Sequence, residues 1–152
     1  MPNSYNRPVS FCPNGEDQIQ RGAPPRQSSY EEAAQLRLAL RTFLRRSETV
    51  ARAHGLTPQR YQLLLLIKTS KEQATVGGLC RSLQLGQSNI TQLVHRAEKL
   101  GLVRGEPSAT DARVRYLHLT PEGERRLGGA VAELAEDRVK LVAALTELPS
   151  PA

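Results

Sequence analysis

One short stretch of the sequence is dense in side chains that hydrogen-bond without carrying charge. They are Gln87, Ser88, Asn89, Thr91 and Gln92. No acidic residue follows them until Glu98. An amide side chain can pair with two atoms of an adenine edge, and hydroxyl groups bond to bases or to phosphates. The stretch therefore predicts contacts with DNA bases, and a merely solvated helix face is the plainer alternative.

The apolar residues around this stretch predict a helix over about residues 87–100. They recur at three- and four-residue steps and form an expected buried stripe of Ile90, Leu93, Val94, Ala97 and Leu100. Gly101 is expected to end the helix, because glycine readily adopts the left-handed conformation of a helix C-cap. A B-form major groove admits one helix, whose first turns reach the bases. Arg96, further along, is expected near the DNA backbone.

Two segments after this helix, residues 102–104 and 114–119, have the short alternating or β-branched pattern of strands. Turn-forming residues separate them, so the pair predicts a β-hairpin with an extended tip. Three arginines flank the tip, namely Arg104, Arg113 and Arg115. Arginine inserted into a narrow minor groove is attracted by its negative potential. A local ion pair between Asp111 and Arg113 is the alternative.

Further helices must support these two features. A helix over about 30–53 is expected to begin at a capping box formed by Ser29 to Glu32. A nearly all-apolar helix after Thr57-Pro58 should be the central buried one, and Thr75 should cap a short third helix. A last helix over 121–148 has leucines at heptad-like steps, and Gly128-Gly129 is expected to kink it.

The charge distribution favours one phosphate-facing surface. The chain has 152 residues and a net charge of +6, and residues 75–120 carry six basic and three acidic groups. Residues 121–152 reverse the sign, with four basic and six acidic groups. Positive charge gathered in the middle of the chain suits a nucleic-acid partner better than a diffuse solubilising charge does.

Several other function classes find little support in the sequence. Cys12 and Cys80 are too few for a secreted disulfide framework, and no apolar run is long enough to cross a membrane, so we expect a reduced cytoplasmic compartment and no membrane partner. Cys80 lies on an apolar stripe and is expected to be a structural thiol, with redox sensing by either cysteine as the alternative. The three histidines are widely spaced, so we expect no metal site. The sequence has no nucleophile-and-base arrangement and no phosphate-binding glycine loop, so we expect no cofactor and no enzyme activity.

The stretch from Thr75 to Leu127 resembles the winged helix-turn-helix of the MarR family, the multiple-antibiotic-resistance regulators. Its most specific parts are Leu100-Gly101-Leu102-Val103, the Asp111-x-Arg113 element, and the segment LTPEG that ends at Gly123. The resemblance extends from about Leu56 and, more loosely, over the first helix. This sequence departs from the common family pattern at Gly78, His95 and Ala112.

The resemblance implies a bacterial, nucleoid-associated regulator that binds a pseudo-palindromic operator as a homodimer. It makes the helix from Gln87 the recognition helix and Arg113 the wing arginine. Family members usually carry a further helix after the position of Leu148, so the first helix and the 121–148 helix are expected to form more of the interface here, with help from the N-terminal tail as the alternative. The expected contacts are Leu36, Leu40, Phe43, Leu134, Leu141 and Leu145.

The resemblance also implies a repressor that a small effector or oxidation releases from DNA. His54, Arg60 and Tyr61 lie near the expected effector region and could hold a small aromatic or anionic ligand, with ordinary packing as the alternative. The second candidate function is a winged-helix module that binds a protein and contacts DNA only weakly.

The expected fold is mainly α with a small β-hairpin wing, that is, a winged helix-turn-helix with N- and C-terminal dimerisation helices. Residues 1–28 are expected to be a disordered tail, because their polar, Pro-rich composition buries little apolar surface. Residues 29–152 form the expected domain, with residues 29–54 and 121–148 as dimerisation helices and residues 56–120 as the DNA-binding lobe.

Overall fold

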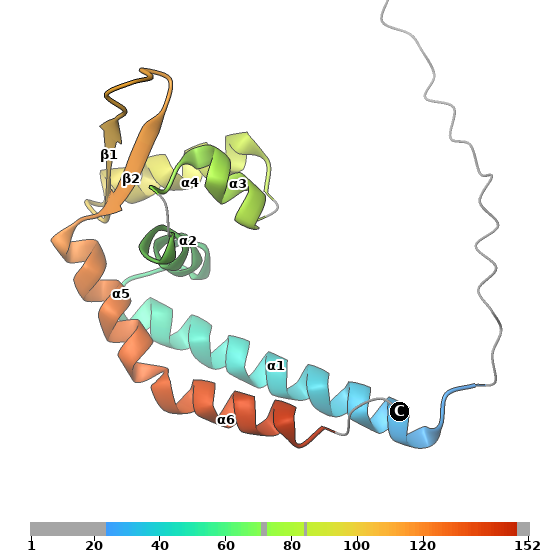
Figure 1. Cartoon of the computed structure of the whole chain (residues 1–152). Coiled ribbons are helices and arrows are strands. Elements are labelled where there is room, and N and C mark those ends of the chain that lie inside the picture. Colours follow the sequence, from blue (N-terminus) through green and yellow to red (C-terminus); the bar gives the residue numbers. More distant parts are fainter. Residues whose placement is uncertain (1–23, 71–72, 84, 149–152) are drawn as a thin grey trace, which may run out of the picture.

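The computed structural model describes residues 24–70, 73–83 and 85–148 (Figure 1). Most of the expected N-terminal tail, including Cys12, lies outside these ranges. The elements in chain order are α1 (Gln27–Ala53), α2 (Pro58–Thr69), α3 (Val76–Leu83), α4 (Gln87–Lys99), β1 (Val103–Pro107), β2 (Arg115–Leu119), α5 (Pro121–Glu133) and α6 (Ala135–Thr146). The predicted fold class, mainly α with a two-stranded hairpin in a winged helix-turn-helix arrangement, is confirmed.

The elements α2, α3, α4, β1 and β2 pack around one hydrophobic core, and we call them the lobe. The helix α2 is central, as predicted, and its Leu63 and Leu64 have no exposed surface. It begins at Pro58 because the Thr57 hydroxyl accepts the backbone N–H of Arg60 at 3.3 Å. Cys80 is a free thiol, half-buried against this core, which agrees with the predicted structural role.

The hairpin is longer on its first strand than the sequence predicts. Its antiparallel register pairs Val103 with Leu119 and Pro107 with Arg115, so β1 includes residues that the sequence pattern assigns to the tip. Proline is tolerated there because β1 is an edge strand. On its other side, β2 receives a bridge from Ala74, whose carbonyl accepts the N–H of Leu117 at 2.8 Å. The hairpin is thereby joined to the segment before α3.

The prediction that a capping box starts the first helix is wrong. Helix α1 begins at Gln27, its N-cap is Arg26, and no side chain caps it. Ser29 therefore lies inside the first turn, where its backbone N–H bonds to the Arg26 carbonyl at 3.0 Å. The side-chain amide of Gln27 donates to Glu31 at 3.2 Å, an i,i+4 contact that supports the earlier start.

The last predicted helix is divided into α5 and α6, and the break is at Leu134, not at Gly128-Gly129. Leu134 is fully buried with Val50 and Ala130, which fixes the bend against α1. The break leaves the Val131 carbonyl without its helical partner, and the Arg138 guanidinium donates to it at 2.7 Å. Gly129 instead leaves room for the His54 ring, because a Cβ at residue 129 would lie 2.6 Å from that ring.

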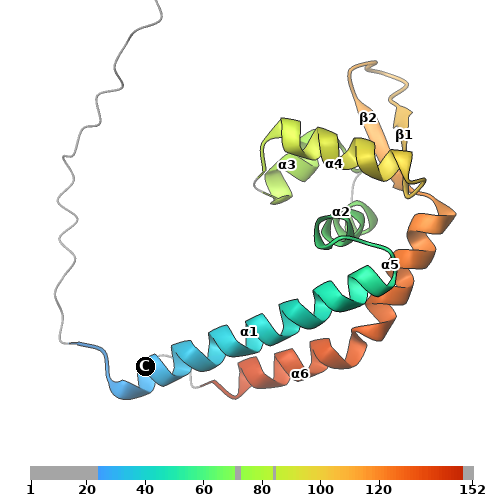
Figure 2. The same ribbon diagram turned by 180° about the vertical axis from the view of Figure 1, so that it is seen from behind.

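Helices α1, α5 and α6 form the second part of the molecule, which we call the arm. Helix α6 lies along α1 in both views, so the chain returns beside its own first helix (Figures 1 and 2). Arg46 of α1 forms ion pairs with Glu133 of α5 at 3.1 Å and with Asp137 of α6 at 3.5 Å. These two ion pairs hold α1 against the helices on both sides of the break. Within the described ranges, no helix is both long and apolar enough to span a membrane.

Candidate nucleic-acid interface

Helix α4 presents the predicted polar face to solvent. Gln87, Ser88, Asn89, Thr91, Gln92 and Arg96 are all exposed. The opposite side packs into the lobe core through Ile90, Val94 and Ala97. Leu100 is not part of this buried stripe, contrary to the prediction. The helix ends at Lys99, Gly101 turns the chain with φ of 67°, and Leu100 is left 50% exposed.

The wing tip is ordered by hydrogen bonds to its own backbone. The Ser108 hydroxyl accepts the N–H groups of Thr110 and Asp111 at 3.2 and 3.4 Å. The Asp111 carboxylate accepts the backbone N–H of Arg113 at 2.9 Å, which is the geometry of an Asx turn. Asp111 therefore shapes the turn through the main chain, and the guanidinium of Arg113 makes no ion pair with the part of the chain that the structure describes.

The other two predicted arginines already have partners. Arg104 makes an ion pair with Glu106, its neighbour two residues along β1. Arg115 of β2 reaches Glu98 of α4, with 3.1 Å between its Nη2 and the Glu98 Oε1. Arg113 is thus the wing arginine whose charge is left for a partner, and it is exposed.

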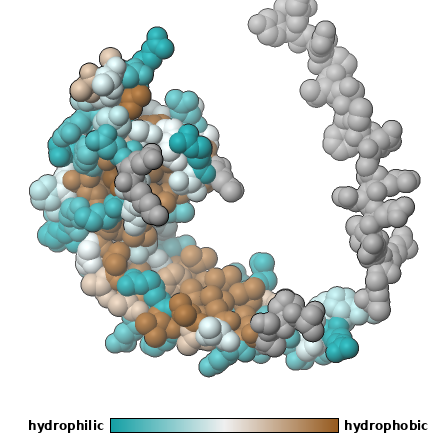
Figure 3. All heavy atoms as spheres, in the orientation of Figure 1, coloured by the Kyte–Doolittle hydropathy of each residue, from teal (hydrophilic) through white to brown (hydrophobic). Residues whose placement is uncertain are grey.

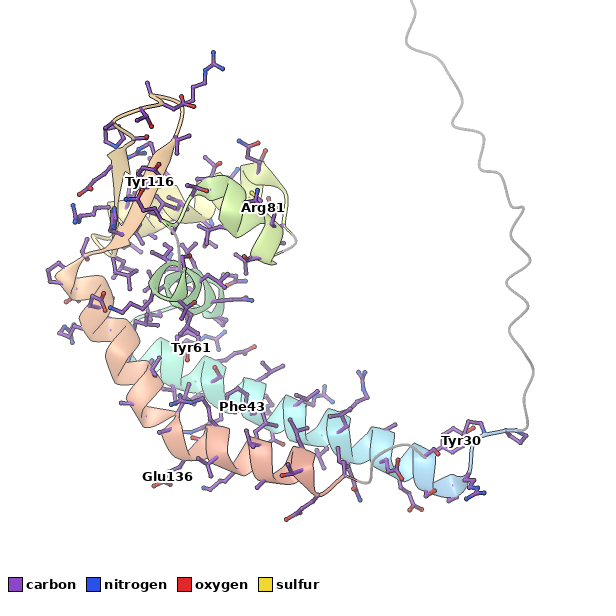
Figure 4. All side chains as sticks on the ribbon, in the orientation of Figure 1. Tyr30, Phe43, Tyr61, Arg81, Tyr116 and Glu136 are labelled. Atoms are coloured by element: carbon purple, nitrogen blue, oxygen red, sulfur yellow. The ribbon has the colours of Figure 1, made fainter. Side chains whose placement is uncertain are left out.

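A cleft between α3 and β2 was missed by the sequence patterns. Its volume is about 660 Å³, and Thr75, Arg81, Ser82 and Tyr116 contribute polar groups to its lining. Figure 4 shows Arg81 on α3 and Tyr116 on the hairpin, and these two elements form opposite walls of the cleft. Its walls come from segments far apart in sequence, and each alone has the pattern of an ordinary amphipathic element.

Comparison with known proteins agrees with this geometry. A sequence model described as MarR family matches residues 54–114, which cover most of the lobe up to the wing tip. A Thauera aromatica protein, named as a candidate transcriptional regulatory protein for the hcr operon, is 32% identical over 89 residues, or 59% of this chain and 51% of that protein. This chain therefore spans about half the length of that relative.

Solved structures have the same fold. A MarR family transcription regulator superposes with a TM-score of 0.63 at 23% identity, covering 80% of this chain and 78% of that one. The M. tuberculosis regulator MosR, solved in complex with DNA, gives a TM-score of 0.57 at 25% identity, covering 70% and 77%. Residues 54–114 of this chain are thus similar in sequence to the MarR family, and the described part of the chain has the fold of the solved MarR regulators.

The residues predicted for a MarR-type effector site are engaged where the lobe meets the arm. His54, at the end of α1, bonds through Nε2 to Glu133 at 3.0 Å. Figure 4 shows Tyr61 between α2 and α1, and its ring packs against the hydrophobic clusters of both parts. Burial raises the pKa of the Tyr61 hydroxyl, and the nearby Arg138 charge opposes that rise. Arg60 lies in the first turn of α2, where its N–H is used in the cap. These contacts favour the packing alternative for His54 and Tyr61.

The residues predicted for a MarR-type dimer interface differ in how much surface they offer. Leu36, Leu40 and Leu145 are between 36% and 39% exposed. Phe43 and Leu141 line a cavity of about 230 Å³ between α1 and α6. Leu134 is fully buried within the chain, so its side chain offers nothing to a partner. Several apolar side chains that are more exposed lie outside the set predicted for the interface: Leu38, Leu44, Val139 and Val142.

Proposed function

We propose that this chain is a DNA-binding transcriptional regulator. In this proposal α4 enters the major groove of a duplex, and Gln87, Asn89 and Gln92 contact base edges. Arg113 enters the adjacent minor groove from the wing. The observation that carries the proposal is the exposed polar face of α4, whose first turns carry no charge, beside a wing arginine that has no ion pair within the described residues.

The family relationship supports the same function. MosR, the relative at 25% identity, was solved in complex with DNA. Acidic groups are also kept away from the expected contact face, because the one acidic residue of α4, Glu98, is paired with Arg115. A bound phosphate therefore meets no unpaired carboxylate on this helix.

We also propose that two copies act together on a pseudo-palindromic site. The arm exposes apolar side chains on both of its long helices, including Leu44 at 57% and Val142 at 60%. Figure 3 shows apolar surface gathered over α1 and α6. A contiguous exposed apolar patch of this kind usually marks an interface. Two lobes held by paired arms could then meet half-sites one helical turn apart.

The regulator is further proposed to be a repressor that is associated with the nucleoid in the bacterial cytoplasm. A small aromatic or anionic effector is proposed to release it from DNA. Release requires that the effector bind the free and DNA-bound forms with different affinity, since equal affinity shifts no equilibrium. The junction of His54, Tyr61 and Glu133 couples arm to lobe, and so is the place where a ligand could alter the spacing of two lobes.

Selection of bound sequences from a random duplex library tests the proposal. The selected duplex should bind with an affinity that falls steeply with salt, by about 0.9 in the log–log slope for each neutralised phosphate. Asn89→Ala and Gln92→Ala should each reduce discrimination between the selected and a scrambled duplex by about 1–3 kcal/mol. Gln59→Ala, an exposed amide on α2, is the matched control and should change nothing.

The same experiment separates the second candidate function. A winged-helix module for a protein partner would enrich no sequence from the library and would bind every duplex weakly. In that case Asn89→Ala and Gln92→Ala would behave like Gln59→Ala, and the DNA-binding proposal would be rejected.

A further inference from the structure

Arg115 occupies an unusual place for an arginine, because it lies on the face of the hairpin that packs against the helices of the lobe. Alternate residues of a strand share a face, so Arg115 is on the side of Leu117, which is buried in the core. On β1 the same face carries Val103 and Gly105, the partners of Leu119 and Leu117 in the register. The Arg115 side chain is 54% exposed, yet it turns towards the neighbouring helix α4 and finds an acidic partner there.

That partner is Glu98, and the Arg115 side chain passes over Gly105 to reach it. The Arg115 guanidinium donates to the Glu98 carboxylate at 3.1 Å and lies 3.4 Å from the Gly105 carbonyl. A Cβ at residue 105 would be 2.5 Å from the Arg115 Nη2 and 3.0 Å from the Glu98 oxygen. Glycine thus leaves open the space that the guanidinium fills, and we call Arg115, Glu98 and Gly105 together the wing clamp.

We propose that the wing clamp sets the angle of the wing to α4, so that Arg115 is a positioning residue and not a contact to DNA. The inference rests on the proposed function and reassigns one residue of its interface. The hairpin projects beyond the helices of the lobe (Figure 1), and its tip is ordered only by bonds within itself among the described residues. Arg113 at that tip reaches a groove only if the strands below it are held in place.

Gly105→Ala opens the wing clamp without changing any charge. The added methyl group displaces the end of a flexible arginine side chain, so the fold is retained. We expect affinity for the selected duplex to fall about two- to fivefold, the range that an exposed ion pair supports, with an unchanged salt slope. Gly128→Ala is the matched control, because no atom lies within 4 Å of a Cβ there, and it should bind as the parent protein does.

Arg115→Gln, Glu98→Gln and the double variant separate positioning from direct contact. If the clamp positions the wing, each single variant loses as much affinity as the double variant, because either change breaks the same link. If Arg115 instead neutralises a phosphate, Arg115→Gln lowers the salt slope by about 0.9 and Glu98→Gln tightens binding. Either of those two results overturns the proposal.

Amide hydrogen exchange provides a measurement that needs no DNA. Backbone N–H groups of β1 and β2 should exchange about two- to fivefold faster in Gly105→Ala and Glu98→Gln, while those of α2 stay unchanged. Unchanged exchange in the hairpin overturns the wing clamp, whatever the DNA results. If the parent protein binds no duplex but the hairpin exchanges faster, the proposed function fails and the positioning of the wing by Arg115 stands.

Discussion

The lobe and the arm differ in how far they bury their apolar side chains. In the lobe, helices and hairpin bury them against one another, and Leu63, Leu64 and Ile90 have no exposed surface. In the arm, α6 contains no buried residue, and α1 buries only Val50 and Ala51, close to its end. The lobe therefore has the core of a self-supporting unit, whereas the described part of the arm has apolar surface left to cover.

Ion pairs show the same contrast. In the lobe, the Arg115–Glu98 pair orients one surface feature relative to another. In the arm, Arg46 bonds to both Glu133 and Asp137 across the break between α5 and α6, and His54 bonds to the same Glu133. These contacts support the bend of the arm beside the small buried cluster of Val50, Ala130 and Leu134. The comparison indicates that stability comes from the lobe, and it makes the arm the expected contact of the proposed dimer.

The largest effect should come from the lobe core. Leu64→Ala removes a fully buried side chain and should lower the free energy of unfolding by about 3 kcal/mol. Val142→Ala in the arm, where the side chain is 60% exposed, should change it by less than about 0.5 kcal/mol. Urea unfolding at a protein concentration low enough to favour monomers measures both. Equal losses in the two variants would contradict the comparison.

The join between the lobe and the arm should be nearly as sensitive. A Cβ at Gly123, in the first turn of α5, would lie 2.1 Å from the Leu102 carbonyl oxygen, and backbone cannot move aside as a side chain can. Gly123→Ala should therefore destabilise the protein by about 1–3 kcal/mol. Gly128→Ala, five residues further along the same helix, meets no atom and should stabilise it by about 0.5–1 kcal/mol, because alanine favours the helix. Thermal unfolding of the two variants should move in opposite directions.

The arm should matter most for association. Val142→Glu and Leu44→Glu place a charge on exposed apolar surface, and each should raise the dimer dissociation constant by about tenfold or more, since a charge buried at an interface is strongly unfavourable. Gln59→Glu, on the exposed face of α2, is the control for added charge. Sedimentation over a range of concentrations measures the constant. A parent protein that stays monomeric throughout would show that the arm covers its apolar surface in another way.

The sequence predicted the lobe better than the arm for a physical reason. Periodicity placed α4 correctly because one side of that helix is buried and the other is solvated, as Ile90 and Gln92 show. Helix α6 lacks such a contrast, because none of its residues is buried, and the sequence pattern places the kink at Gly128-Gly129. The break at Leu134 depends on the pocket formed with Val50 and on the bond from Arg138 to the Val131 carbonyl.

Contacts between distant segments explain the other differences. Arg115 fits the pattern of a basic wing, and nothing in its neighbourhood along the chain indicates that it crosses Gly105 to reach Glu98. The capping box at Ser29 satisfies the local pattern, yet the helix already begins two residues ahead of it, at Gln27. Local patterns located the polar face of α4 and the wing tip, while the partners of individual arginines required the fold.

The smallest effect should come from an ion pair on the surface of α5. Hydrogen bonds from Arg125 and then Arg126 lower the pKa of Glu122 from 4.5 to about 2, and burial opposes them only weakly. A carboxylate with a lowered pKa in the folded state contributes stability above its unfolded pKa, and this contribution is lost as pH falls from about 4.5 towards 2.

Glu122→Gln should flatten the decline in stability over that window and leave the salt slope of DNA binding unchanged, because α5 lies outside the proposed interface. Urea unfolding at intervals between pH 2 and pH 6 measures the difference. A variant whose decline runs parallel to that of the parent protein would show that Glu122 has the same pKa in the folded and unfolded chain, and that solvent screens the arm's surface pairs completely.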